Sequence, residues 1–428
     1  MNILVVGGGG REHAIICKLA ESPRVDKLYC APGNGGISKF AECFDVKATD
    51  IEGQVALAKR LKPDMVVVAP DDPLVLGLVD ELEKEGFMTF GPNKAAAIIE
   101  GSKVFSKQLM KKYGIPTAKY EVFSDSAAAI DYIKKENSYP TVIKADGLAL
   151  GKGVIIAQNE EEAVTAVHEM IDKLKFGSSS STVVVEEFLT GPEVSVLSFT
   201  DGNTVVPMVS SMDHKRAYDN DEGLNTGGMG TVAPNPYYTD AVAKECMETI
   251  FLPTIKAMKA EGRTFKGCLY FGLMITPKGP KVIEYNCRFG DPETQVVLPL
   301  LDSDLCDIFE AVYKGTLSDM DIKWKNENCA CVVMASGGYP VSYKKDIPMA
   351  GFDDKGQVEG AFVYHAGTKF EDGVFKTSGG RVIGVTATGD TLQAALDKAY
   401  KAVDRISFEG AHFRHDIGQR ALLVARKG

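Results

Sequence analysis

Short apolar segments alternate with helical segments through the first 90 residues, and this alternation constrains the fold more than any other feature. Residues 2–6 form an apolar strand, four glycines follow at 7–10, and residues 11–20 have helical spacing. The pattern then predicts a helix over 51–61, a strand over 65–69, a helix over 78–85 and a strand over 87–90. Strands that alternate with helices form parallel sheets, whose ligands bind at the carboxyl ends of the strands.

The four glycines do not complete the dinucleotide fingerprint G-x-G-x-x-G. Its third glycine would have to stand where this chain has Glu12 or His13. Glycines ahead of a helix N-terminus nevertheless expose backbone N–H groups to an anion. The sequence leaves two interpretations open: a phosphate site at Gly8, Gly9 and Gly10, or a plain tight turn.

A second glycine-rich segment begins after a strand predicted over 141–144. Residues 145–153 read Ala-Asp-Gly-Leu-Ala-Leu-Gly-Lys-Gly, and a further strand follows over 154–156. This is not a Walker A loop, because Asp146 replaces its first glycine and Gly153 replaces its Ser or Thr. A glycine hairpin can still fold over a triphosphate, with Lys144 and Lys152 as countercharges.

Two polar segments follow. The strand predicted over 182–185 leads into Glu186-Glu187-Phe188-Leu189 and Glu193, which either read an adenine edge and ribose hydroxyls or form an ordinary loop. Residues 211–236 are polar and rich in glycine, and loops of that length are usually functional or disordered. Within them, His214 is more simply a surface or packing histidine than a catalytic base.

The densest group of candidate site residues lies at 284–294. A turn at 277–280 predicts a hairpin, so Glu284 and Asn286 share one face of its returning strand, and Arg288 joins them if the strand continues. Carboxylate and amide oxygens suit Mg²⁺, and a fixed cation suits a carboxylate or phosphoryl group. The alternative is an exposed polar strand edge.

Composition excludes several classes of protein. The 428 residues suffice for two to four domains, and the net charge is −10 without any basic block, so we expect no nucleic-acid partner. There is no basic leader and no run of about 18 apolar residues, so we expect a cytoplasmic protein without a membrane partner. The nine cysteines include no CxxC pair or zinc-type cluster, which is typical of thiols in a reducing compartment.

After Trp324 a third α/β pattern begins, with strands predicted over 330–335 and 381–388 and a helix over 391–406. Glycine pairs at 337–338 and 379–380 stand beside the predicted strand ends. They either let a substrate approach or simply form turns.

Taken in order, four segments resemble the ATP-grasp superfamily, in which two small α/β lobes hold ATP between them. They are Lys103 and the segments 144–153, 186–193 and 284–288. Within that superfamily the chain is similar to the glycinamide ribonucleotide synthetases, through motifs at 8–14, 31–36, 100–103, 213–216, 225–230, 284–293, 378–382 and 416–418. The resemblance implies an α/β fold with an N-terminal parallel-sheet, Rossmann-like domain (1–100), a two-lobed ATP-grasp module (101–325, with 118–190 as its small lid lobe) and a small C-terminal α/β domain (326–428).

The same resemblance implies a ligase that joins glycine to 5-phosphoribosylamine and hydrolyses ATP to ADP and phosphate, an early step of purine synthesis. Glycine's carboxylate would attack the γ-phosphorus to give glycyl phosphate, and the amine would then displace phosphate. The implied cofactors are ATP and Mg²⁺, with Mn²⁺ as an alternative metal, and the partners are the two small-molecule substrates. We expect a monomer, with a dimer as the alternative.

Site residues carry over from the resemblance position by position. Glu284 and Asn286 would bind the metal, and the catalytic residues would be Arg288, Lys215 and Asp213. Nucleotide contacts would come from Lys103, Lys144, Gly147, Gly151, Lys152, Gly153, Glu186, Glu187, Leu189 and Glu193. Substrate contacts would come from Gly8, Gly9, Gly10, Asp71, Asn225, Thr226, Gly227, Gly228 and Asp291.

Two positions depart from the family pattern. The strand before Glu284 carries Phe271 and Gly272 where many ATP-grasp enzymes have a further acidic metal ligand, so metal binding rests more on Glu284 and Asn286. Asp71 stands where the family usually has glutamate, so its substrate contact would be shorter by one methylene.

Three other functions remain open. Another ATP-grasp carboxylate–amine ligase would have the same ATP residues. A nicotinamide dehydrogenase is disfavoured by the missing third glycine, and a non-catalytic nucleotide-binding protein is disfavoured by Glu284, Asn286 and Arg288.

Overall fold

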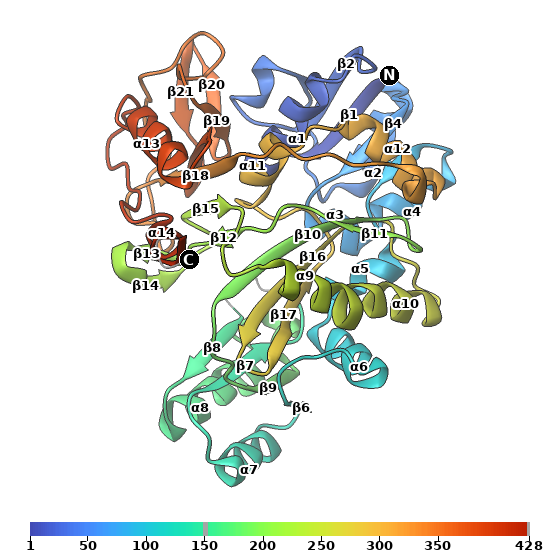
Figure 1. Ribbon diagram of the computed structural model, residues 1–428, viewed down its shortest axis with the longest axis vertical. Helices are drawn as coiled ribbons and strands as arrows, with labels where there is room; N and C mark the ends of the chain where they lie inside the picture. The colour runs from blue at the N-terminus through green and yellow to red at the C-terminus, as the bar shows by residue number, and fades with distance from the viewer. Residues whose placement is uncertain (149–152, 426–428) are drawn as a thin grey trace.

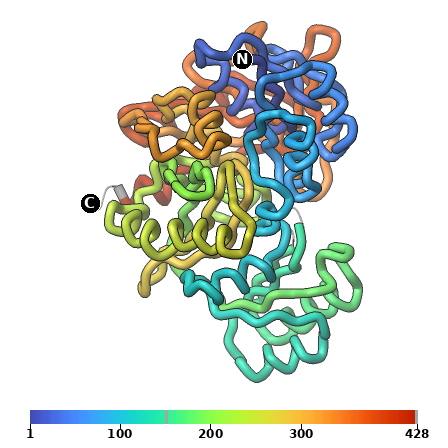
Figure 2. Tube along the Cα trace, turned by 90° about the vertical axis from the view of Figure 1, so that its right-hand side faces the viewer, coloured from blue at the N-terminus to red at the C-terminus, as the bar shows by residue number. Residues whose placement is uncertain are grey.

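The computed structural model describes residues 1–148 and 153–425. Figure 1 shows the N-terminal domain in blue beside the C-terminal domain in orange and red, at one end of the molecule, and a small blue-green lobe at the other end. A larger green and yellow lobe lies between them, and Figure 2 shows the same arrangement from the side. The predicted order of a parallel-sheet domain, a two-lobed module and a small C-terminal domain is confirmed.

The N-terminal domain is built on a sheet of order β3-β2-β1-β4-β5, in which every neighbouring pair is parallel, as predicted. Its central strands are apolar and buried, as expected of a sheet covered on both faces. The strands are β1 (Asn2–Gly7), β2 (Lys27–Pro32), β3 (Glu42–Cys43), β4 (Met65–Val68) and β5 (Met88–Phe90). The helices are α1 (Gly10–Ala20), α2 (Ile51–Leu61), α3 (Asp71–Leu76), α4 (Leu78–Lys84) and α5 (Lys94–Gly101).

The small lobe has an antiparallel sheet of order β6-β9-β7-β8 and a hydrophobic core of its own. Its elements are β6 (Tyr120–Phe123), α7 (Ser126–Glu136), β7 (Thr141–Ala145), β8 (Val154–Ala157), α8 (Glu160–Val167) and β9 (Val183–Glu187). The predicted glycine hairpin joins β7 to β8. Two of its predicted ligands, Gly151 and Lys152, lie outside the described residues.

The large lobe has an antiparallel sheet of order β11-β10-β16-β17. The hairpin predicted to end at Asn286 is its β16–β17 pair. The elements are α6 (Lys103–Tyr113), β10 (Glu193–Thr200), β11 (Val205–Pro207), α9 (Asp240–Cys246), α10 (Leu252–Ala260), β16 (Gly267–Thr276) and β17 (Gly279–Asn286). After β17 the chain forms α11 (Thr294–Val297) and α12 (Leu305–Lys314), which pack against the N-terminal domain (Figure 1).

The C-terminal sheet has the order β12-β15-β18-β22-β19, and it recruits two strands from the middle of the chain. These are β12 (Met212–Asp213) and β15 (Gly230–Ala233); β13 (Arg216–Tyr218) and β14 (Glu222–Asn225) form a hairpin between them. The remaining elements are β18 (Asn328–Ala335), β19 (Phe362–His365), β20 (Thr368–Glu371), β21 (Val374–Thr377), β22 (Arg381–Gly389), α13 (Leu392–Val403) and α14 (Gln419–Ala425). The long polar segment is thereby tied to the C-terminal domain at both of its ends.

In the described ranges, no helix has the length and apolar character needed to cross a bilayer. All nine cysteines are free thiols.

Candidate active site

A cleft of about 630 Å³ lies where the two lobes and the two flanking domains meet. That volume is typical of small-molecule sites. The predicted residues that line it are Asp71, Lys103, Lys144, Gly153, Glu186, Glu187, Leu189, Glu193, Lys215, Asn225, Thr226, Gly227, Glu284, Asn286, Arg288 and Asp291. The predicted residues Gly8, Gly9, Gly10, Gly147, Asp213 and Gly228 do not line it.

The β16–β17 hairpin brings the acid, the amide and the arginine to one wall of the cleft. Glu284 pairs with Gly272 and Val282 pairs with Leu273, so Ile283 is an extra residue in β17. Such a bulge redirects the side chains that follow it. A side chain at position 272 would crowd the acid, because a Cβ at Gly272 would lie 3.0 Å from Cγ of Glu284.

Glu284 is free to accept a ligand. Within the described part of the chain, its carboxylate makes no hydrogen bond or ion pair, although it lines the cleft. It is a neighbour of Lys103, whose pKa is lowered by burial and raised in part by Glu284. A carboxylate without a protein partner is suited to a cation.

Glu100, near the end of α5, binds all three residues that follow Tyr285. Its Oε1 accepts from Nδ2 of Asn286 at 2.9 Å and lies 3.1 Å from Nη2 of Arg288. Its Oε2 accepts from the backbone N–H of Cys287 at 2.7 Å. Burial raises the pKa of Glu100, and Arg288 opposes that shift. No local pattern in the sequence predicts a role for Glu100, because its contact with Asn286 joins residues that are far apart in the chain.

One N–H group of Arg288 has no hydrogen-bond partner among the described residues. Its Nε is buried and finds no partner among the described residues, whereas Nη2 pairs with Glu100 and Nη1 donates to the Phe289 carbonyl. Burial alone would lower the pKa of Arg288, but Glu100 and Asp71 outweigh it and raise the pKa. The pKa of Asp71, the first residue of α3, is lowered: burial alone would raise it, but Arg288 and Arg11 outweigh the burial. The guanidinium is therefore held charged, with one N–H available for an anion.

Two lysines and Glu186 form a buried wall where the small lobe meets α6. Lys144 lies 3.2 Å and Lys107 3.0 Å from Oε2 of Glu186, whose Oε1 is buried without a partner in the described structure. Burial lowers the pKa of Lys107 to about 8, opposed by Glu186. Sequence reasoning missed Lys107, although its position four residues after Lys103 places both on one face of α6.

The base of the glycine hairpin is fixed to the start of α6. Lys103 donates to the carbonyl of Gly147 at 3.0 Å. Asp146, which replaces the Walker glycine, accepts from Oγ of Ser102 and from the N–H of Val104. Asp146 thus binds one of the N–H groups in the first turn of α6, whose N-cap is Ser102.

The two remaining acids of the nucleotide prediction have different surroundings. Glu187 accepts from the N–H of Lys119 and pairs with Lys281 at 2.9 Å, so its carboxylate already has protein partners. Glu193 has its pKa raised by burial, opposed by Lys215.

The segment between β12 and β15 presents Lys215, Asn225, Thr226 and Gly227 to the cleft. Lys215 pairs with Asp213 at 3.0 Å; burial alone would lower the pKa of Lys215, but Asp213 raises it. His214 is buried: Nδ1 lies 3.1 Å from the Gly230 carbonyl and Nε2 accepts from the N–H of Gly418. It is the packing histidine favoured by the sequence.

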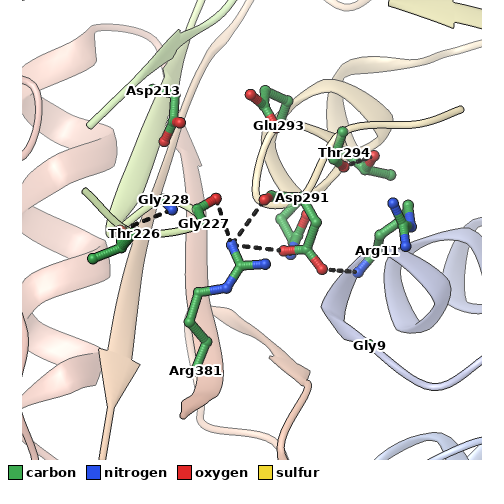
Figure 3. Close-up of polar contacts among 12 residues, drawn as sticks. Gly9, Arg11, Asp213, Thr226, Gly227, Gly228, Asp291, Glu293, Thr294 and Arg381 are labelled. Carbon is green, nitrogen blue, oxygen red and sulfur yellow. Dashed lines mark hydrogen bonds and ion pairs between the residues drawn. The ribbon is translucent and has the colours of Figure 1, made fainter. Parts of the chain in front are cut away.

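Asp291 lies where three domains meet (Figure 3). Its Oδ2 accepts from the N–H of Arg11 in α1, and its Oδ1 accepts from Gln295 and lies 3.4 Å from Nη1 of Arg381. The same Nη1 donates to the carbonyls of Asp291 and Gly227. Gly227 also donates to the hydroxyl of Tyr339, so the C-terminal domain holds both polar groups of this residue.

The first glycine turn is closed by the protein's own groups. Gly9 donates to Oε2 of Glu12 at 2.6 Å, and a Cβ at Gly8 would lie 2.5 Å from the Gly33 carbonyl oxygen. With Asp291 on Arg11, two carboxylates stand at the N-terminus of α1. The N–H groups of Gly9 and Arg11 therefore already have carboxylate partners at this turn.

Three domain models of one family match the chain in order. The phosphoribosylglycinamide synthetase N domain matches residues 1–100, the ATP-grasp (A) domain matches 101–294, and the C domain matches 329–420. The chain belongs to the phosphoribosylglycinamide synthetase family. The family, the fold class and the ligase class predicted from the motifs are thereby confirmed.

Individual relatives agree along the full length. The chain is 50% identical over 417 residues to the phosphoribosylamine–glycine ligase of Caldanaerobacter subterraneus subsp. tengcongensis, which covers 97% of this chain and 99% of the relative. The crystal structure of the Thermotoga maritima phosphoribosylamine–glycine ligase matches with a TM-score of 0.86 and 32% identity, covering 97% of this chain and 100% of that one.

A more distant likeness concerns the fold alone. The biotin carboxylase domain of the Hydrogenobacter thermophilus 2-oxoglutarate carboxylase, solved with MgADP and bicarbonate, matches with a TM-score of 0.74 and 18% identity, covering 99% of this chain and 93% of that one.

Proposed function

We propose that this cleft joins glycine to 5-phosphoribosylamine with hydrolysis of ATP, giving glycinamide ribonucleotide, ADP and phosphate. The family match over the whole chain supports the reaction. The observation that carries the site is a pair of cleft groups with no partner among the described residues, the half-buried Glu284 carboxylate and the buried Nε of Arg288. One is suited to a metal ion on a nucleotide and the other to an anionic reactant.

The reaction proceeds in two transfers. A carboxylate oxygen of glycine bonds to the γ-phosphorus of ATP, the bond to the β-phosphate oxygen breaks, and ADP leaves glycyl phosphate behind. The amine of phosphoribosylamine then bonds to the carbonyl carbon and phosphate leaves. Arg288 orients the glycine carboxylate and stabilises the acyl phosphate through Nε, because phosphoryl transfer depends on positioning and charge neutralisation.

The nucleotide lies between the lobes, with Lys103 and Lys144 near its phosphates and Leu189 and the free Oε1 of Glu186 near its adenine. Glu193 receives the ribose. Closure of the hairpin at Gly147 and Gly153 excludes water, which protects glycyl phosphate from hydrolysis.

The residues present fit Mg²⁺, with Mn²⁺ as the alternative. Among the described residues no group of three or more His, Cys, Asp or Glu side chains could hold a metal. Mg²⁺ needs only one or two protein ligands when phosphates complete its shell, and Glu284 with Oδ1 of Asn286 supplies two oxygens. When bound, Mg²⁺ neutralises the phosphate charge as ATP is cleaved.

The amine substrate enters at the opposite end of the cleft, lined by Asp71, Arg11, Gly227 and Arg381. The positive side chains there suit its phosphate. Lys215 lines the cleft and, paired with Asp213, holds the reacting groups in line. We further infer a cytoplasmic enzyme, because the nine free thiols suit a reducing compartment, and a monomer as its working form.

Phosphate release from ATP tests the reaction. We expect release that requires both glycine and phosphoribosylamine, and that falls by about 10³-fold in Arg288→Ala while ADP still binds. Release driven by bicarbonate or by another amino acid would instead establish a different ATP-grasp ligase. An unchanged rate in Arg288→Ala would contradict the role given to this residue.

A further inference from the structure

Glu100 is the only described residue that bonds to Asn286, Cys287 and Arg288 together. It is 7% exposed and comes from α5 in the N-terminal domain, whereas the three donors follow one another at the end of β17 in the ATP-grasp module. Both of its oxygens are occupied by these donors, so Glu100 is not itself a free ligand like Glu284.

The contact with Asn286 decides which end of that amide faces the cleft. An ionised carboxylate only accepts hydrogen bonds, so Asn286 must present its NH₂ group to Glu100. Its Oδ1 is then directed away from Glu100, and it makes no other hydrogen bond in the described ranges. Without Glu100, either end of the amide could face the cleft, and only the oxygen can bind a cation.

We propose that Glu100 is a positioning residue that turns Oδ1 of Asn286 toward the metal and, through its second contact, sets Arg288 beside it. This inference rests on the proposed function and assigns the N-terminal domain a part in metal binding. A single carboxylate thereby aligns the metal ligand with the arginine that binds the reacting carboxylate.

Reversal of the hydrogen-bond polarity tests this role. In Glu100→Gln the new amide oxygen must stay on the backbone N–H of Cys287, because that donor cannot turn. The new NH₂ then faces Asn286, whose amide turns over and directs its own NH₂ to the metal. We expect the Kd of Mn²⁺ in the presence of ADP, measured by electron paramagnetic resonance, to rise by about 10- to 100-fold.

Asn286→Asp should raise the same Kd, because two carboxylates then face each other without a proton between them. In the double variant, the new amide at position 100 donates to one oxygen of the new carboxylate at position 286. The other oxygen of that carboxylate is left for the metal, and the total charge of the pair is restored. We expect the double variant to recover most of the lost Mn²⁺ affinity, a coupling that a double-mutant cycle measures. Losses that simply add would contradict the proposal, as would an unchanged Kd in Glu100→Gln.

A matched control is Glu12→Gln. Glu12 is also a buried carboxylate of the N-terminal domain that accepts from a backbone N–H and pairs with an arginine. It makes no hydrogen bond or ion pair with Glu284, Asn286 or Arg288. We expect it to leave the Mn²⁺ Kd unchanged. The Kd of Mn²⁺ is measured with ADP and without substrates, so it does not depend on the ligase reaction. If glycine and phosphoribosylamine failed to release phosphate, the proposed function would be overturned. The double-mutant cycle at positions 100 and 286 would still decide the role of Glu100.

Discussion

Two acidic residues on the same stretch of chain, Glu284 and Asp291, have opposite surroundings. Both line the cleft. Glu284 makes no hydrogen bond or ion pair with any described residue, whereas Asp291 bonds through both carboxylate oxygens, and through its carbonyl, to Arg11, Gln295 and Arg381. One acid is left for a ligand and the other joins the N-terminal, ATP-grasp and C-terminal domains.

The difference shows how to sort polar residues in one motif. A buried polar group costs free energy unless it is paired, so a group that the protein leaves unpaired in a cleft is available to a ligand. A group whose partners are all supplied by the protein stabilises the arrangement of the cleft instead. Predicted substrate binding by Asp291 therefore has to coexist with its role between the domains.

Glu284→Gln gives the largest effect expected from this comparison. The change removes a charged metal ligand that no protein group replaces, so the rate of phosphate release should fall by more than about 100-fold. The free energy of unfolding in urea should change by less than about 1 kcal/mol, because Glu284 makes no hydrogen bond or ion pair with a described residue. A protein that keeps its activity, or that becomes less stable, would place Glu284 among the structural acids.

Asp291→Asn should act mainly on stability. The hydrogen bonds and ion pairs around Asp291 involve charged partners, so the free energy of unfolding should fall by about 2 kcal/mol. Urea denaturation measures this change. The exposed Arg405–Glu359 pair provides a control, because Glu359→Gln should cost less than about 1 kcal/mol. If Asp291→Asn lowers the rate as much as Glu284→Gln without a loss of stability, the two acids do not differ in the way described.

The smallest expected effect is the pH dependence of the stability that Asp291 contributes. Burial alone would raise the pKa of Asp291, but Arg381 and Arg11 outweigh it and lower the pKa below the ordinary value of 3.8. A lowered folded-state pKa contributes stability that is complete above the unfolded-state pKa and is lost as the pH falls through the folded-state pKa. The difference in unfolding free energy between the wild type and Asp291→Asn should therefore shrink below pH about 4. A difference that stays constant down to pH about 3 would contradict this assignment.

Local patterns predicted fewer than half of the described elements, but these include the strands that carry the site. The parallel sheet followed from the alternation of apolar strands and helices, and the β16–β17 hairpin followed from the turn before Lys281. Glu284, Asn286 and Arg288 all line the cleft, but the strand carries a bulge at Ile283 that its alternation did not reveal, and it ends at Asn286, before Arg288. The family motifs supplied the reaction, because their order and spacing along the chain resemble those of the family.

Local sequence patterns did not predict the contacts between distant segments. Glu100 beside Asn286, Lys107 beside Glu186, and Arg381 beside Asp291 each join separate parts of the chain. Hydrophobic periodicity indicates which face of a helix or strand is buried. It does not indicate which segment of another domain packs against that helix or strand.

The amino-acid sequence by itself predicted the fold class, the family and a set of candidate site residues, since these depend on local spacing and residue chemistry. Only the tertiary structure decided which of those side chains are free to bind a ligand. Glu284 and Asp291 are alike in sequence as acids of one motif, and they differ because α1, α11 and β22 bring donors to Asp291, whereas no described donor reaches Glu284. Whether a carboxylate is paired depends on which distant segments pack against it. A buried charge without a partner costs free energy, so the packing decides which acid is available to a ligand.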